Sequence, residues 1–304
     1  IGAGGIFGLK ALDSSLKVSE EYAHQLNIMN MAGLKHVEIA QAIAAAWKTT
    51  GSVITSTVTG NLKAFMDLRN VFGSTSEAIQ YMPELVRLQA VLKSSTESSV
   101  SQNAEQLAYS VAKALDIRGA VNNPAEFNKQ AEMMGKVIVA MQGRVLPQDY
   151  QMLFKYGRQA IPSLSDTFLY QELPTLMQEM KGSGGGGSSG GFGPPLAAFY
   201  RFFVQGIMTK AALQGMQSLG IISRNAGLRT STVGTQLMGG QHVLDVGLAQ
   251  TDQIQWVQQV LLPAIRRHYG NNLNKQQLSL AITDAMRGAS QTAIFGVLQY
   301  ALKA

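Results

Sequence analysis

The chain has 304 residues, of which 46% are hydrophobic, enough for one large domain or two modest ones. Charged residues make up only 14%, against roughly 25% in an average soluble domain, so we expect part of an assembly or a surface covered in use. The absence of cysteine excludes disulfide frameworks, thiolate catalysis and cysteine-based zinc sites. The net charge is +6, but Lys and Arg are spread along the chain, so no sequence-specific nucleic-acid site is expected.

The chain opens with nine uncharged residues, IGAGGIFGL. This stretch is too short to span a bilayer, which needs about 20 apolar residues, and it lacks the basic region of a signal peptide. Because the first residue is Ile1 and not Met, we expect the cut end of a longer hydrophobic segment.

Helical periodicity dominates the first third of the sequence. Residues 9–32 are amphipathic, and their stripe contains Leu9, Leu12, Leu16, Ala23 and Leu26. Residues 36–48 form a second helix whose apolar face, Ile39, Ile43 and Trp47, is expected to pack in the core. Gly51 should end that helix, and residues 53–59 should form a loop or a short extended piece.

The next segments are separated by recognisable stops. Residues 61–72 are predicted to be helical, and Ser74 and Glu77 fit a capping box. Pro83 should break the following pattern into a short turn at 75–81 and a helix at 83–93, because proline removes a helix hydrogen bond. After a polar break at 94–101 we expect a helix at about 102–116.

Asn123 and Pro124 predict the start of another helix. Its stripe steps by four and three through Phe127, Ala131, Met134, Ile138 and Met141, two heptads that fall short of a coiled coil. Pro147 should open the next helix, and Pro162 and Pro174 punctuate the run that follows.

Residues 182–193, GSGGGGSSGGFG, have the composition of a flexible linker. We therefore expect an all-α, multi-helix fold with two helical regions, 1–181 and 194–304, joined by this linker. The second region should contain helices around Phe199 to Phe203, at 209–219, from Asp252 with a kink at Pro263, and at about 274–287 and 289–303. Between them, 221–250 should be irregular, with a small hairpin at LRTSTVGTQL.

No motif predicts catalysis, a cofactor or a metal. The histidines His24, His36, His242 and His268 lack metal-ligand spacing, and Ser14 and Lys17 match only the bare spacing of some serine acyl enzymes. Matches to GxSxG (Gly187, Ser189, Gly191) and GxGxxG (Gly182, Gly184, Gly187) follow from the glycine run itself. Glu126 with Glu132, and Glu172 with Glu179, read as solvated helix faces, and Trp256, like Trp47, reads as core. We therefore expect no enzyme and assign no catalytic, cofactor or metal residue.

Four segments resemble the tail tape-measure proteins of long-tailed bacteriophages and related prophages. They are EIAQAIAAAWKTT (38–50), NLKAFMDLRNVFGSTSEAI (61–79), FGPPLAAFYRFFVQGIMTKAALQGMQSLGI (192–221) and DQIQWVQQVLLPAI (252–265). The resemblance implies a virion protein packed in several copies inside the tail tube or at its tip, made in the host cytoplasm, which sets tail length and assists genome ejection. Its partners would be its own copies, tube and tip proteins, and the host envelope.

The ruler function of that family converts helix length to tube length at about 1.5 Å per residue. Thirty-one glycines and eight prolines would break such a rod, so we expect a folded helical region attached to it. The fourteen methionines favour adaptable helix contacts within the chain or between copies. Two alternatives stay open: a membrane-active or pore-forming helical protein, and a cell-wall hydrolase carried by the tail.

Overall fold

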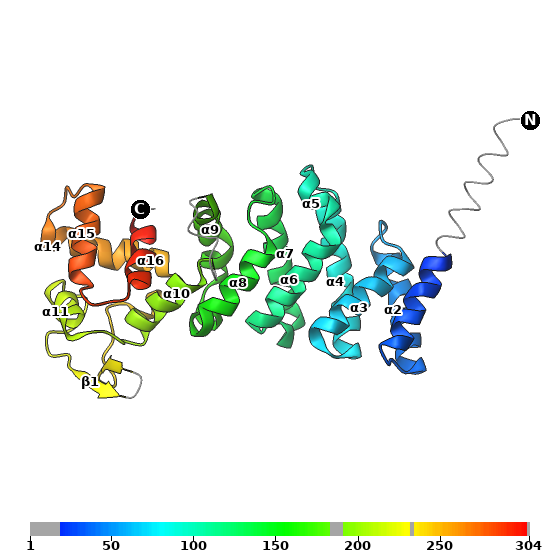
Figure 1. Ribbon diagram of the computed structural model, residues 1–304, viewed down its shortest axis with the longest axis horizontal. Helices are drawn as coiled ribbons and strands as arrows, with labels where there is room; N and C mark the ends of the chain where they lie inside the picture. Colours follow the sequence, from blue (N-terminus) through cyan, green and yellow to red (C-terminus); the bar gives the residue numbers. More distant parts are fainter. Residues whose placement is uncertain (1–18, 183–190, 232–233, 303–304) are drawn as a thin grey trace, which may run out of the picture. The chain divides into compact units, whose positions relative to one another are not determined.

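The computed structural model describes residues 19–182, 191–231 and 234–302 (Figure 1). The chain divides into two compact units, one ending at Gln148 and the other starting at Asp149. Within the described ranges the regular structure is helical apart from a single two-stranded hairpin. The predicted all-α, multi-helix fold is therefore confirmed.

Short helices follow one another in the first unit. They are a helix over 19–31, α2 (His36–Ser52), α3 (Val58–Phe72), α4 (Thr75–Lys93), α5 (Ser98–Gln102), α6 (Ala104–Arg118), the 3₁₀ turn η1 (Ala120–Asn122) and α7 (Pro124–Ala140). Helix α4 contacts α2, α3, α5, α6 and α7, so it is the centre of the unit. Figure 1 shows these helices in succession from blue to green.

The core of the first unit lies along α4. Its Tyr81 ring packs against Phe127 of α7 at 4.4 Å and against Phe72 of α3 at 5.3 Å between ring centroids. Aromatic pairs of this kind add about 0.5–1.5 kcal/mol beyond the burial of their area. Asn123 caps α7 as predicted, because its side chain accepts the N–H groups of Ala125 and Glu126. The ring contacts hold α7 against α4, and the cap determines where α7 begins.

The predicted break at Pro83 is wrong, because α4 runs without interruption from Thr75 to Lys93. An interior proline costs a helix about 3 kcal/mol. Here the apolar side chains on both sides of it, Met82, Leu85 and Val86, are buried in the core. Each contributes about 1.5–3 kcal/mol, so tertiary packing outweighs the local cost. The predicted cap at Ser74 is present, and its hydroxyl accepts the N–H of Glu77.

Other boundaries differ by a few residues. Helix α2 continues through Gly51 to Ser52, and α3 begins at Val58, with a loop between them and no strand. Of the stripe predicted over 9–32, Leu9, Leu12 and Leu16 lie outside the described residues. Ala23 is exposed, Leu26 is half-buried, and the fully buried side chain of the 19–31 helix is Met29.

The second unit contains more interrupted helices. They are α8 (Pro147–Gly157), which starts at the unit boundary, the 3₁₀ turn η2 (Arg158–Ser163), α9 (Leu173–Gly182), α10 (Gly193–Phe199), α11 (Lys210–Ser218), α12 (Val246–Thr251), α13 (Gln253–Trp256), α14 (Leu262–Tyr269), α15 (Lys275–Ala285) and α16 (Gln291–Ala301). Three π-helical turns join or extend these helices: η3 (Phe168–Glu172), η4 (Tyr200–Val204) and η5 (Val257–Leu261).

Two of the π-turns precede a proline by the same distance. Pro174 follows η3 and Pro263 follows η5, each two residues after the last π-helical residue. Where a helix returns from π to α hydrogen bonding, one carbonyl already lacks a helical donor. The proline therefore removes an N–H where the ladder is interrupted in any case. The disturbance predicted at Pro263 takes this form.

Aromatic side chains fill the core of the second unit. The Trp256 ring is fully buried and lies 4.6 Å from Phe203 and 5.6 Å from Phe199 between centroids, and its indole N–H donates to Leu244 O at 2.8 Å. Tyr300 of α16 packs on Phe199 at 5.8 Å. The core position predicted for Trp256 is confirmed.

The predicted hairpin is also present. Strands β1 (Leu228–Ser231) and β2 (Gly234–Leu237) pair antiparallel, with Leu228 opposite Leu237. Ile207 adds an isolated bridge to Gln236.

The two compact units divide at a different place from the two predicted regions. Helices before and after the Gly/Ser-rich segment pack together, because α10 contacts both η2 and α16. At Gly193 a Cβ atom would lie 2.7 Å from Tyr156 Cβ and 2.9 Å from Gly157 N, so only glycine permits this approach. The Gly/Ser-rich segment predicted to separate two helical regions therefore lies within the second unit, since the boundary between the units is at Gln148 and Asp149.

The contact between α11 and α15 provides a test of this packing. A Cβ atom on Gly215 would lie 2.2 Å from the carbonyl oxygen of Ala285, and backbone cannot rotate away as a side chain can. We expect Gly215→Ala to lower the free energy of unfolding by about 1–3 kcal/mol, as overpacking does. Gly247→Ala in α12 is the control, since no atom lies within 4 Å of its Cβ position. Urea unfolding of both variants measures the difference, and equal stabilities would contradict the close contact.

Candidate functional site

The described residues include candidate metal ligands, whereas the candidate nucleophiles lie outside the described ranges. Across the described ranges, no group of three or more His, Cys, Asp or Glu side chains could hold a metal ion. Ser14 and Lys17 lie outside the described residues, as do Gly184, Gly187 and Ser189 of the glycine motifs.

Of the four glutamates assigned to solvated helix faces, Glu132 and Glu179 are exposed, whereas Glu126 and Glu172 are half-buried. On α7, Glu126 binds the Gln130 side chain, whereas Glu132 forms an exposed ion pair with Lys136 at 2.6 Å. Glu172 instead lies against Asp252, a partner that the sequence did not suggest. We call Asp252 and Glu172 the carboxylate pair: Asp252 is buried and Glu172 is half-buried.

Local structure places both members of the pair. Asp252 is 4% exposed and caps α13, where its Oδ1 accepts the Gln255 N–H at 2.9 Å. Glu172 ends the π-turn η3, and its Oε1 accepts a hydrogen bond from Gln255 Nε2 at 3.1 Å. Its other oxygen, Oε2, is buried and has no hydrogen-bond partner among the described residues. Gln255 therefore holds both carboxylates from one helical turn.

Burial is the main cause that raises the pKa of Asp252 to about 6, and the negative charge of Glu172 and a hydrogen bond with its side chain add to it. The hydrogen bond from the Gln255 N–H acts in the opposite direction. Tyr300 is the other titratable group that faces Asp252, and burial followed by the Asp252 charge raises the pKa of its hydroxyl well above the usual value. Tyr300 is therefore a neutral donor at physiological pH.

A polar chain continues from this pair into the core. The Tyr300 hydroxyl donates to Gln253 Oε1 at 2.9 Å, and Gln253 Nε2 donates to Leu196 O at 3.3 Å. Gln253 is fully buried, so these bonds satisfy a side chain that would otherwise be costly to bury. These two hydrogen bonds connect α16 and α10 to α13, directly after the Asp252 cap.

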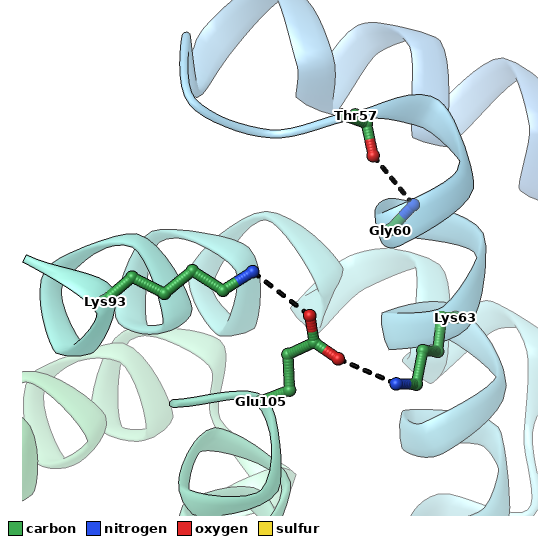
Figure 2. A network of polar contacts seen from close by, with 5 residues as sticks. All are labelled: Thr57, Gly60, Lys63, Lys93 and Glu105. Carbon is green, nitrogen blue, oxygen red and sulfur yellow. Dashed lines mark hydrogen bonds and ion pairs between the residues drawn. The ribbon is translucent and has the colours of Figure 1, made fainter. Parts of the chain in front are cut away.

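A second polar cluster lies in the first unit (Figure 2). Glu105 at the start of α6 accepts from Lys63 of α3 at 2.7 Å and from Lys93 of α4 at 3.1 Å. The hydrogen bond from Lys63 is the main cause that lowers the pKa of Glu105. Burial raises the pKa of the neighbouring Asp67. These residues line an open groove of about 470 Å³ together with Asn103 and Tyr109.

This second cluster joins three helices and does not resemble an active site. All three paired side chains are about half exposed, and ion pairs at such positions contribute about 0–1 kcal/mol. Its function is to fix the N-terminal end of α6 against α3 and α4. Figure 2 also shows the nearby cap of α3, where Thr57 Oγ1 accepts the Gly60 N–H at 3.1 Å.

Trp47 does not occupy the core position predicted for it. Its side chain is 62% exposed, whereas the predicted Ile39 is buried and Ile43 is half-buried. The other buried residues of α2 are Ala42, Ala46 and Thr49. Asn61 of α3 donates to Ala46 O at 3.0 Å, so the small alanine side chains allow α3 to approach closely. The large side chains Val37 and Trp47 are left on the outer face of the helix.

Comparisons with protein-family models, with curated proteins and with solved structures found no match to this chain. Among the described residues, no helix is both long enough and apolar enough to cross a membrane.

The carboxylate pair predicts how stability depends on pH. The unfolded chain releases the Asp252 proton near 3.8, whereas the folded chain releases it near pKa 6. Between these values the folded state binds more protons, so stability is lost as the pH rises through this window. We expect Asp252→Asn, which keeps the cap acceptor, to stabilise the second unit by about 1–2 kcal/mol above pH 7.

Thermal unfolding of wild type and Asp252→Asn near pH 4 and above pH 7 tests this prediction. Near pH 4 the difference between the two proteins should be much smaller, because the folded-state aspartate is then largely protonated and the unfolded-state aspartate is still partly protonated. A gain of the same size at both pH values would show that charge burial is not its cause.

Proposed function

We propose that this chain is a structural protein of a bacteriophage tail, a tape-measure-type component that acts through contacts between protein chains. In this proposal it is present in several copies, contributes to tail length in assembly and assists passage of the genome through the envelope. The four ordered segments that resemble the tape-measure family support it, and they lie in both units.

The observation that carries the proposal is the outer face of α2. Val37 and Trp47 are 68% and 62% exposed on that face, with the small residues Ala40 and Ala44 between them. Exposed apolar patches that include a large aromatic residue mark protein contact surfaces. Ala40, Ala44 and Trp47 of this face lie within 38–50, the first segment of the resemblance, and Val37 directly precedes it, so most of the face that is available to another copy belongs to the resembling residues.

The packing within each unit favours a folded region over a ruler rod. Among the described residues the longest helix, α4, has 19 residues, and consecutive helices in the first unit pack against one another. We therefore propose that residues 1–304 are a folded helical region attached to the length-determining rod, acting at the tail tip or the host envelope.

Within the part of the chain that the structure describes, the carboxylate pair is the candidate site for the hydrolase alternative. Glycosidases place two carboxyl groups on either side of an accessible bond, about 5–10 Å apart. Asp252 is instead almost fully buried and accepts a backbone N–H as a helix cap, which favours a structural function for the pair.

Purified tails test the proposal directly. We expect the chain to be found by mass spectrometry in tails purified from phage or induced prophage particles, in more than one copy per tail. An in-frame deletion of its coding region should give tails of altered length, or none, in electron micrographs. Tails that lack the chain but have normal length and infectivity would contradict the proposal. Clearing of peptidoglycan in a zymogram would favour the hydrolase alternative.

Self-association tests the α2 face separately. We expect Trp47→Ala to weaken oligomers of the 304-residue chain by about tenfold or more, because a central aromatic anchor contributes 2 kcal/mol or more to an interface. Leu280→Ala, on an exposed position of α15, is the matched control. Light scattering coupled to size exclusion measures both. An unchanged mass for Trp47→Ala would remove this face from the interface.

A further inference from the structure

The positive charge of the chain is concentrated in one part of the sequence. Residues 182–304 contain nine Lys and Arg against three Asp and Glu, so they carry the whole net charge of +6. No acidic residue occurs between Glu179 and Asp245. The asymmetry in charge arises because acidic residues are scarce in this part of the sequence, not because basic residues cluster there. It is therefore not apparent from the positions of Lys and Arg alone.

Two of the three acids are engaged in the protein. Asp252 is buried at its cap position. Asp284 accepts from the Tyr269 hydroxyl at 2.9 Å and also pairs with Arg287. Among the described residues of this part of the chain, six exposed cations form no ion pair with a carboxylate, and they create a positive potential at the surface. They are Lys210, Arg224, Arg229, Arg266, Arg267 and Lys275.

Hydrogen bonds bring several of these cations to adjoining helix ends. The cations Arg266 and Arg267 are exposed in the last turn of α14 beside His268, and the bond from Tyr269 to Asp284 joins that turn to α15. Thr209 Oγ1 donates to Arg287 O at 2.9 Å, which joins the end of α15 to the start of α11. Figure 1 shows α11, α14 and α15 next to one another.

We call the resulting set the basic surface: Lys210, Arg266, Arg267, His268 and Arg287, all of them exposed. Asp284 is the acidic residue within it. Three of its five members are arginines, whose planar guanidinium groups bind phosphate through two parallel hydrogen bonds.

The neighbouring residues favour nucleic acid over a lipid surface. The loop after α14 exposes the amides of Asn271 and Asn272, which can donate to phosphate and sugar oxygens. The apolar side of α14, formed by Leu262, Ala264 and Ile265, is buried in the unit and is not free to enter a bilayer. We propose that the basic surface binds the phosphate backbone of nucleic acid without reading its sequence.

Binding of the 304-residue chain to a labelled DNA duplex of about 30 base pairs, followed by fluorescence anisotropy at salt concentrations from about 50 to 200 mM, tests the proposal. The wild type should bind with an affinity that falls steeply with salt and does not change when the DNA sequence is shuffled. Each phosphate contact adds about 0.9 to the slope of log affinity against log salt.

The variant Arg266→Ala with Arg267→Ala should reduce the slope by about two and the affinity by about tenfold or more at 0.1 M salt. The control, Lys48→Ala with Lys136→Ala, removes two exposed cations from the first unit and should change the affinity by less than about threefold. Circular dichroism of all three proteins verifies that the fold is retained.

Three results would overturn the proposal. They are absence of duplex binding by the wild type at low salt, equal losses in the two double variants, or binding to anionic phosphatidylserine vesicles without binding to DNA. Because the assay uses the isolated chain, its outcome does not depend on whether the protein belongs to a phage tail.

Discussion

Frequent interruption of the helices is the constraint on which the structure depends. In the described part of the chain the longest helix has 19 residues, and most helices have fewer than 16. Helices of this length are marginal in isolation, so each must bury its apolar side on a neighbour. Helix α4 does so against five others, and Trp256 is enclosed by the aromatic rings of interrupted helices. The low surface charge fits a chain whose stability comes from such contacts.

The sequence predicted helix type and caps well, because these depend on neighbouring residues. The caps at Ser74, Asn123 and Asp252 and the hairpin all follow from local chemistry. Positions that depend on distant packing were predicted less well. At Pro83 buried neighbours outweigh the proline, and on α2 the alanines, not Trp47, face the core because α3 approaches so closely.

The carboxylate pair shows why the rest could not be predicted. The cap at Asp252 is readable from its own segment, but Glu172 lies on a distant helix that contains a π-turn. Such a turn adds a residue and rotates the positions after it by about 100°. The 3.6-residue periodicity before the turn therefore does not predict which side chains after it share a face. The unequal distribution of acidic residues was readable from the sequence alone, but the helix ends that bring the bases together were not.

The close approach of Gly193 to Tyr156 and Gly157 has a consequence for the covalent connectivity of the second unit. The helices before and after 183–190 are held together by their own packing, so the peptide bonds between them are not what keeps them in place. A cut within that segment would leave two fragments able to reassemble as one folded body. The same position could also accept new chain termini or an inserted domain, because the glycine-to-backbone contact defines where the returning chain must dock.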